Sequence, residues 1–185
     1  MPNLLTPRAA AFLCSREAIG LSAYLCPANV WTWAGGIAES GGNQVRQYKD
    51  NPQPLDKCLR ATVDLIRARY LPDVVKAFGG RDLAEHQLAA ALSFEWRNGS
   101  ISRAQWVRDF LSGKLDAARA NIMQWTNFGQ QIARAQAERD LFFDARWPAD
   151  LRASVFTAKG PTYKFAGGKA TDVLPLLTQI MGQKE

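Results

Sequence analysis

Residues 16–36 read REAIGLSAYLCPANVWTWAGG and are the most informative part of the 185-residue chain. Upstream, Thr6-Pro7 predicts a helix start, with threonine as the N-cap and proline at the first helical position. Gly20 is a typical helix stop, which puts Glu17 in the last turn of that helix. From Leu21 to Trp33 the pattern changes to strand-like residues around a turn, so the stretch predicts a helix that leads directly into a β-hairpin.

The predicted hairpin gathers polar side chains on one face. A three-residue turn over 27–29 pairs Cys26 with Val30 and Tyr24 with Thr32. Cys26 and Thr32 then become diagonal neighbours about 7–8 Å apart, a separation that accommodates one water molecule. Eight residues separate Cys26 from Glu17, a carboxylic acid that can donate a proton. We therefore take Glu17, Cys26 and Thr32 as candidate catalytic residues: an acid and two groups that position water, as hydrolysis of a glycosidic bond requires.

The remainder of the chain is mainly helical. A helix that begins at Leu55 should be broken or kinked at Pro72. Residues 83–96 are largely apolar and predict a central buried helix, which Asn98-Gly99 ends. Glu95, inside that helix, is either a second acid or a residue that reaches solvent or an arginine. Ser102 is the expected cap of the next helix, and further helices are predicted over 115–125, 129–143 and 171–181.

The composition is that of an ordinary soluble globular protein, with 47% apolar and 22% charged residues. The formal net charge of +6 favours polyanionic partners, but the basic residues are scattered along the chain, so we do not expect nucleic acid binding. No stretch approaches the ~20 apolar residues that span a bilayer, and no secretion signal is recognisable, so stable membrane insertion is not expected. Three cysteines without CxxC spacing argue against a disulfide framework and a metal site, and we expect Cys14 and Cys58 to be small buried hydrophobes.

Three pieces of the chain, in order, resemble the phage-type lysozymes, the endolysins of glycoside hydrolase family 24. GLSAYLCPANVWTWAGG is similar to that family's hairpin, LSFEWRNGSI to the end of its central helix, and ARAQAERDLFF to an arginine-rich late helix. The spacing from Glu17 through Cys26 to Thr32 fits the family arrangement E-x8-(D or C)-x5-T. The resemblance extends from about Pro7 to Trp147.

The resemblance implies a role for each matching residue. Glu17 is the acid, Cys26 stands where the family has Asp or Cys, and Thr32 helps to hold the attacking water. The family's Gly-His step matches Gly36-Ile37, so the histidine is missing here. Arg134 stands in the place of an arginine pair and is expected to orient the glutamate. The expected substrate-binding residues are Tyr24, Gly36, Asn98 and Arg134.

The fold that the resemblance implies is α+β and lysozyme-like, with a small N-terminal lobe that holds a β-hairpin or three-stranded sheet and a mainly helical C-terminal lobe. We expect a single domain over residues 1–185. Its parts are a sheet-containing lobe at 1–54, a connecting helix over 55–78, a helical lobe over 79–150 and a C-terminal extension over 151–185.

The implied function is that of a phage or prophage endolysin, which hydrolyses the β-1,4 bond between N-acetylmuramic acid and N-acetylglucosamine in peptidoglycan and lyses the host cell. The partner is the peptidoglycan glycan strand, no cofactor or metal is implied, and we expect a monomer. We expect such an enzyme to be retained in the host cytoplasm and to reach the periplasm and cell wall after a holin permeabilises the membrane. Two alternatives stay open: a lytic transglycosylase or chitinase-like glycosidase of the same fold, and a catalytically inactive basic binding module.

The role of Cys26 stays open among base, water-orienting group and nucleophile. An ordinary thiol is mostly protonated at neutral pH and is therefore a weak base there. We favour a water-orienting group with modest base character.

Overall fold

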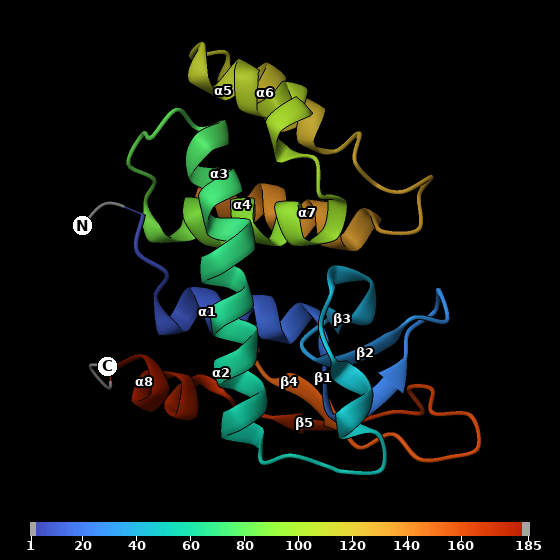
Figure 1. Cartoon of the computed structure of the whole chain (residues 1–185). Helices are drawn as coiled ribbons and strands as arrows, with labels where there is room; N and C mark the ends of the chain where they lie inside the picture. The colour runs from blue at the N-terminus through green and yellow to red at the C-terminus, as the bar shows by residue number, and fades with distance from the viewer. Residues whose placement is uncertain (1–2, 183–185) are drawn as a thin grey trace. The chain divides into compact units, whose positions relative to one another are not determined.

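The computed structural model describes residues 3–182 and divides the chain into two compact units (Figure 1). The first unit holds the residues up to Ala9 and Ile66–Ala149. The second unit holds Ala10–Leu65 and the residues from Asp150 onward. Within residues 3–182, no helix combines the length and the apolar character that crossing a membrane requires.

The second unit is built on a five-stranded sheet with the strand order β3-β2-β1-β4-β5. Its strands are β1 (Ala18–Leu25), β2 (Trp31–Ala34), β3 (Ile37–Ala38), β4 (Ala153–Phe156) and β5 (Lys169–Thr171). The antiparallel β1–β2–β3 part is the predicted three-stranded sheet, whereas β4 pairs parallel to β1 and β5 pairs antiparallel to β4. The α+β fold class is confirmed, and the C-terminal segment adds two strands that the sequence pattern does not predict.

Helix α1 (Pro7–Arg16) begins as predicted, because the backbone N–H of Ala9 donates to Thr6 Oγ1 at 3.1 Å. The helix ends earlier than predicted. Glu17 is not in its last turn but forms the bend that follows it, where its backbone N–H donates to the Cys14 carbonyl at 3.3 Å. Strand pairing explains the difference, since Ile19 pairs with Val155 and cannot continue the helix.

Two further helices pack around this sheet. Helix α2 (Leu55–Leu65) contacts β1, β2 and α8 (Leu174–Gly182), which confirms the predicted closing helix. The buried apolar residues here include Ile19, Ala23, Leu59, Val63, Val173 and Leu177. Thr62 ties α2 to the sheet, because its hydroxyl oxygen accepts the Gly35 N–H at 3.1 Å.

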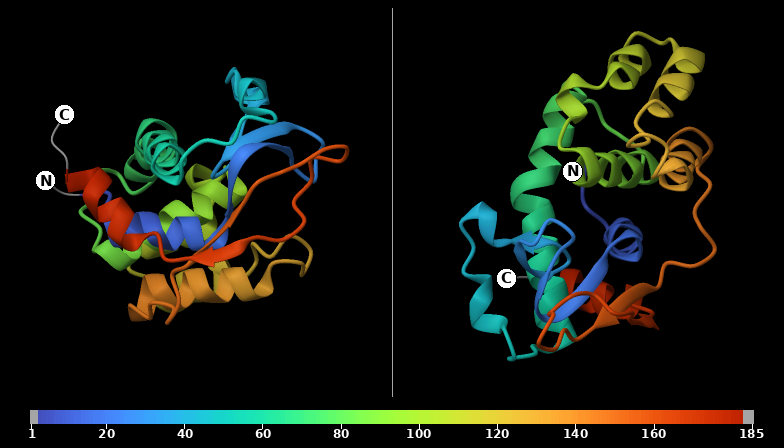
Figure 2. Two further views of the ribbon diagram at one scale, coloured as in Figure 1. Left: turned by 90° about the horizontal axis from the view of Figure 1, so that it is seen from below. Right: turned by 90° about the vertical axis from the view of Figure 1, so that its right-hand side faces the viewer.

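The first unit is helical. Its α-helices are α3 (Leu71–Ala77), α4 (Glu85–Asn98), α5 (Gln105–Leu111), α6 (Leu115–Ile122) and α7 (Ile132–Asp144). Helices α4 and α7 pack along each other, as do α5 and α6 (Figures 1 and 2). Helix α4 is buried from Leu88 to Glu95, which confirms the predicted central helix. Buried rings form the core around Trp106, whose ring centroid lies 5.3 Å from that of Phe94 and 5.0 Å from that of Phe142.

Two helix boundaries in this unit have instructive causes. Before Pro72 the chain forms a π-helical turn, Ile66–Tyr70, and this turn is the interruption of the helix that the sequence predicts at Pro72. A proline has no N–H to donate to the preceding turn, and a widened turn accommodates that loss. The predicted cap at Ser102 is wrong, because Ser102 lies inside a 3₁₀ turn (Ile101–Arg103) and Ala104 precedes α5. Glu95 does not reach solvent as one alternative held, since it is buried and accepts the Ile101 N–H at 2.7 Å.

A buried carboxylate joins α4 to α7. Glu138 of α7 is fully buried, and its Oε2 lies 2.6 Å from Arg97 Nη2. Glu138 Oε1 accepts the Ser93 hydroxyl at 2.8 Å and lies 3.3 Å from Arg134 Nε. Each buried charge therefore has hydrogen-bonding partners, as stability requires.

We predict that Glu138→Ala lowers the free energy of unfolding by about 3–5 kcal/mol, because the Arg97 guanidinium would remain buried without its partner. Urea titration followed by circular dichroism measures the change. The control is Asp64→Ala on an exposed position of α2, which should stay within about 0.5 kcal/mol of the unmodified protein. Equal losses in the two variants would contradict this role of Glu138.

Candidate active site

The β1–β2 hairpin has the predicted register. Tyr24 pairs with Thr32 and Leu25 with Trp31, and the Cys26 N–H donates to the Val30 carbonyl at 3.1 Å. The turn is closed by the Asn29 N–H, which donates to the Cys26 carbonyl at 2.8 Å. Asn29 has a left-handed backbone (φ 56°), a conformation that asparagine tolerates better than most residues. The hairpin therefore has the three-residue turn that the sequence predicts.

Thr32 is held with its hydroxyl already engaged. Its side chain is buried, and Oγ1 donates to the Val30 carbonyl at 3.0 Å. Because that bond uses the hydroxyl hydrogen, the lone pairs of Oγ1 are the part that can bind a further donor, such as a water O–H. Tyr24 lies directly opposite and shares this face of the hairpin.

Tyr24 links Glu17 electrostatically to Cys26. Burial raises the pKa of Tyr24, and the Glu17 carboxylate and then the Cys26 thiolate raise it further. Glu17 and Cys26 are therefore both near enough to Tyr24 to disfavour its ionised form. The phenol stays neutral at physiological pH and keeps its O–H as a hydrogen-bond donor.

The Tyr24 ring lies against the backbone of Gly20. A Cβ atom at Gly20 would be 2.6 Å from Tyr24 Cδ1, so only glycine leaves room for the ring. The other side of the contact is Phe156 of β4, whose ring centroid lies 5.0 Å away in an edge-on arrangement. Gly20 thus leaves room for Tyr24, but it is not the helix stop that the sequence predicts, because α1 ends at Arg16 and Gly20 lies inside β1.

A pocket of about 240 Å³ opens beside Cys26. Its lining consists of Tyr24, Leu25, Cys26, Pro27, Lys164 and Phe165. Lys164 and Phe165 come from the segment between β4 and β5 and are absent from the sequence-based site. No local sequence pattern predicts these two residues, because their position depends on the pairing of β4 with β1, and these two strands are far apart in the chain.

The other predicted substrate-binding residues are distributed over both units. Gly36 is in the turn between β2 and β3, and its φ of 104° is a conformation that favours glycine. Asn98 and Arg134 belong to the first unit. Arg134 lies beside Glu138, and its Nη2 donates to the Ser93 carbonyl at 3.5 Å.

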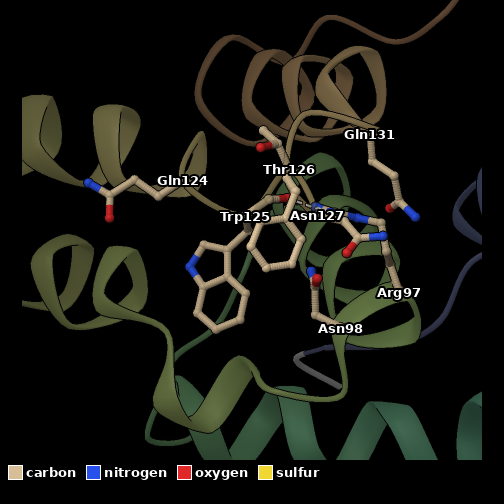
Figure 3. A pocket seen from close by; sticks show the side chains of 8 residues that line it. Arg97, Asn98, Gln124, Trp125, Thr126, Asn127 and Gln131 are labelled. Atoms are coloured by element: carbon tan, nitrogen blue, oxygen red, sulfur yellow. Dashed lines mark hydrogen bonds between the residues drawn. The ribbon is translucent and has the colours of Figure 1, made fainter.

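Asn98 lines a larger pocket of about 610 Å³ in the first unit (Figure 3). Arg97 and Asn98 contribute from the end of α4, and the segment before α7 supplies the rest. The full lining is Arg97, Asn98, Gln124, Trp125, Thr126, Asn127, Phe128 and Gln131. The structure therefore gathers Glu17, Tyr24, Cys26 and Thr32 around one hairpin and puts Asn98 in a separate pocket.

The three cysteines differ in their surroundings. Cys14 and Cys58 are buried, as predicted, and burial raises the pKa of each thiol to about 12. The Glu17 carboxylate adds to the shift at Cys14, and Asp56 adds to it at Cys58. Cys26 is half-buried and lines the hairpin pocket. Among residues 3–182, no group of three or more His, Cys, Asp or Glu side chains is arranged to hold a metal ion.

Comparison with known proteins finds a family and several solved structures. The family model described as phage lysozyme matches residues 15–140. A search of curated proteins finds no match. The chain is similar to the structure of an endolysin from Escherichia coli O157:H7 phage FAHEc1, with a TM-score of 0.62 at 13% identity over 78% of this chain and 96% of the other.

Two further structures are similar over almost their whole length. The muramidase domain of SpmX from Asticaccaulis excentricus has a TM-score of 0.58 at 17% identity, over 76% of this chain and 97% of the other. A mutant of P22 lysozyme has a TM-score of 0.60 at 19% identity, over 75% of this chain and 97% of the other. At these identities the structural likeness establishes the fold.

We predict that a thiol-reactive disulfide reagent at pH 8 labels one cysteine of the native protein, Cys26, and all three in denaturant. A pKa raised to about 12 keeps Cys14 and Cys58 protonated well above that pH, and the thiolate is the reactive form. Absorbance of the released chromophore counts the thiols. The Cys26→Ser variant should release none while folded, and rapid labelling of two thiols in the native protein would refute the assignment.

Proposed function

The chain belongs to the phage lysozyme family, and we propose that Glu17, Cys26 and Thr32 carry the reaction of this peptidoglycan-cleaving glycoside hydrolase. The bond is the β-1,4 linkage between N-acetylmuramic acid and N-acetylglucosamine. The observation that supports these residues is that all three lie near Tyr24. Tyr24 pairs with Thr32 across the hairpin, and Glu17 and Cys26 add to the rise in its pKa that burial causes.

Glu17 is the proton donor of this proposal. As the bond between the muramic acid C1 and the glycosidic oxygen breaks, its electron pair stays on the oxygen, which takes the proton from the Glu17 carboxyl group. Positive charge then builds on the sugar ring in an oxocarbenium-like transition state. The Glu17 carboxylate left behind is reprotonated from solvent before the next cycle.

Thr32 and Cys26 hold the water that attacks C1. Thr32 Oγ1 donates to the Val30 carbonyl, so it accepts a hydrogen from the water and leaves the water's own lone pair directed at the sugar. Cys26 orients the same water from the tip of the hairpin. Because the sugar carries most of the positive charge as the water arrives, the water loses its proton to solvent after the C1–O bond has formed.

The biological role is host cell lysis by an endolysin. We propose that the enzyme is held in the host cytoplasm and reaches the peptidoglycan after a holin-type protein permeabilises the membrane, in keeping with its family. Its net charge of +6 favours binding to an anionic cell wall.

We expect Glu17→Gln to lower the lysis rate at least about 100-fold, the usual range for loss of a general acid. The assay follows the turbidity of outer-membrane-permeabilised bacteria, with circular dichroism to establish that the variant is folded. Glu39→Gln is the matched control, because this carboxylate lies in the same unit but pairs with Arg46, outside the candidate site. Lysis by Glu17→Gln at the unmodified rate would remove Glu17 from the mechanism.

We expect Cys26→Asp to keep lytic activity, because a carboxylate orients water at least as well as a thiol. The anomer of the freshly released sugar, read by NMR, tests the alternative in which Cys26 is the nucleophile. Direct attack by water inverts the anomeric centre, whereas a thioglycosyl intermediate gives net retention. Retention, or a folded Cys26→Asp enzyme without activity, would contradict the water-orienting role.

A further inference from the structure

The C-terminal segment brings Lys164 to the Cys26 end of the hairpin by backbone pairing. The Leu25 N–H donates to the Tyr163 carbonyl at 2.7 Å, and Leu25 forms a parallel bridge with Lys164. The segment between β4 and β5 runs beside the β1–β2 hairpin (Figures 1 and 2). Backbone pairing with Leu25, the last residue of β1 before Cys26, therefore fixes the position of Lys164.

Side-chain contacts hold the same segment in place. The Tyr163 hydroxyl donates to Asp50 Oδ2 at 2.8 Å, and its ring centroid lies 5.4 Å from that of Trp31 in β2. The Lys49 ammonium lies 4.7 Å from the centroid of the Tyr163 ring, which adds a second cation to this region. Phe165 packs edge-on against Phe156, with 4.9 Å between ring centroids.

The pocket beside Cys26 combines apolar walls with one cation. Tyr24, Leu25, Pro27 and Phe165 form the walls, and Lys164 is the charged residue of the lining. Phe165 is 50% exposed, so part of its ring is available to a ligand while the ring packs against Phe156. Such a site suits a ligand with small apolar groups and a carboxylate.

Peptidoglycan carries such a ligand next to the bond that is cut. The proposed reaction puts the C1 atom of N-acetylmuramic acid at the water held by Cys26 and Thr32. The lactyl ether on the same sugar ring bears the peptide stem, which begins with alanine and supplies the carboxylates of the strand. A glycan of the chitin type has neither the stem nor these charges.

We propose that Lys164 and Phe165 form a subsite for the peptide stem, in which the Lys164 ammonium binds a stem carboxylate and Phe165 contacts the apolar part. The inference rests on the proposed function, because that function puts the muramic acid at Cys26. Both residues lie beyond residues 15–140, the span of the family match. The subsite makes the enzyme favour peptide-bearing strands over bare glycan.

The test measures binding to two soluble probes by calorimetry, in the full chain carrying Glu17→Gln to stop turnover. One probe is a glycan strand with tetrapeptide stems, and the other is the same strand after an amidase has removed its peptides, which leaves only the lactyl carboxylate on each muramic acid. We expect Lys164→Met to weaken binding of the first probe about five-fold, as for one partly solvated ion pair, and to leave the second unchanged. Lys164→Arg should restore most of the loss, and the matched control is Lys159→Met, an exposed lysine of the same segment.

Each other outcome overturns the proposal. Equal binding by Lys164→Met and the parent protein would show that Lys164 contacts no stem. Equal weakening for both probes would assign Lys164 to the glycan and its lactyl carboxylate instead of the stem. An equal loss of affinity for the first probe in Lys159→Met would show that the effect comes from the net charge of the protein and not from a contact of Lys164. Turnover of the probes by the Glu17→Gln protein, seen as shortened strands, would instead contradict the proposed function and is read separately from binding.

Discussion

The hydrogen bond from the Cys26 N–H to the Val30 carbonyl is the constraint on which the candidate site depends. It sets the length of the turn, and the turn sets which residues of β1 and β2 face each other. A slip of one residue would move Thr32 to the opposite face of the sheet from Tyr24. The Val30 carbonyl also accepts the Thr32 hydroxyl, so one backbone group positions both polar side chains of the proposed water site.

Tyr24 then connects this water site with the acid. Its ring occupies the space that Gly20 leaves free, and Phe156 covers it from β4. Burial, Glu17 and Cys26 raise the pKa of its phenol, so the centre of the site is an uncharged donor between ionisable residues. The first unit differs, because the group at its centre is charged. Glu138 forms an ion pair with Arg97 and stabilises the packing of α4 against α7.

Much of this arrangement is predictable from local sequence, and the exceptions have a common cause. The Thr6 cap, the hairpin turn, the register of Tyr24 with Thr32 and the central helix α4 all depend on residues close together in the chain, and all are confirmed. The end of α1 and the two C-terminal strands depend on pairing between β1 and β4. Short segments such as β4 and β5 carry little periodic signal, so Lys164 and Phe165 could not be predicted beside Cys26. The roles of Glu17, Cys26 and Thr32 remain predictions from spacing and chemistry.

The parallel pairing of β1 with β4 has a consequence for how the enzyme matures. A ribosome completes the hairpin early, but β4, the strand that flanks it, lies far along the chain and emerges much later. Until then β1 has an open edge and Tyr24 lacks the cover of Phe156. A nascent chain that has not yet reached β4 therefore carries the residues of the site without its finished architecture, and the site is completed only after β4 has emerged.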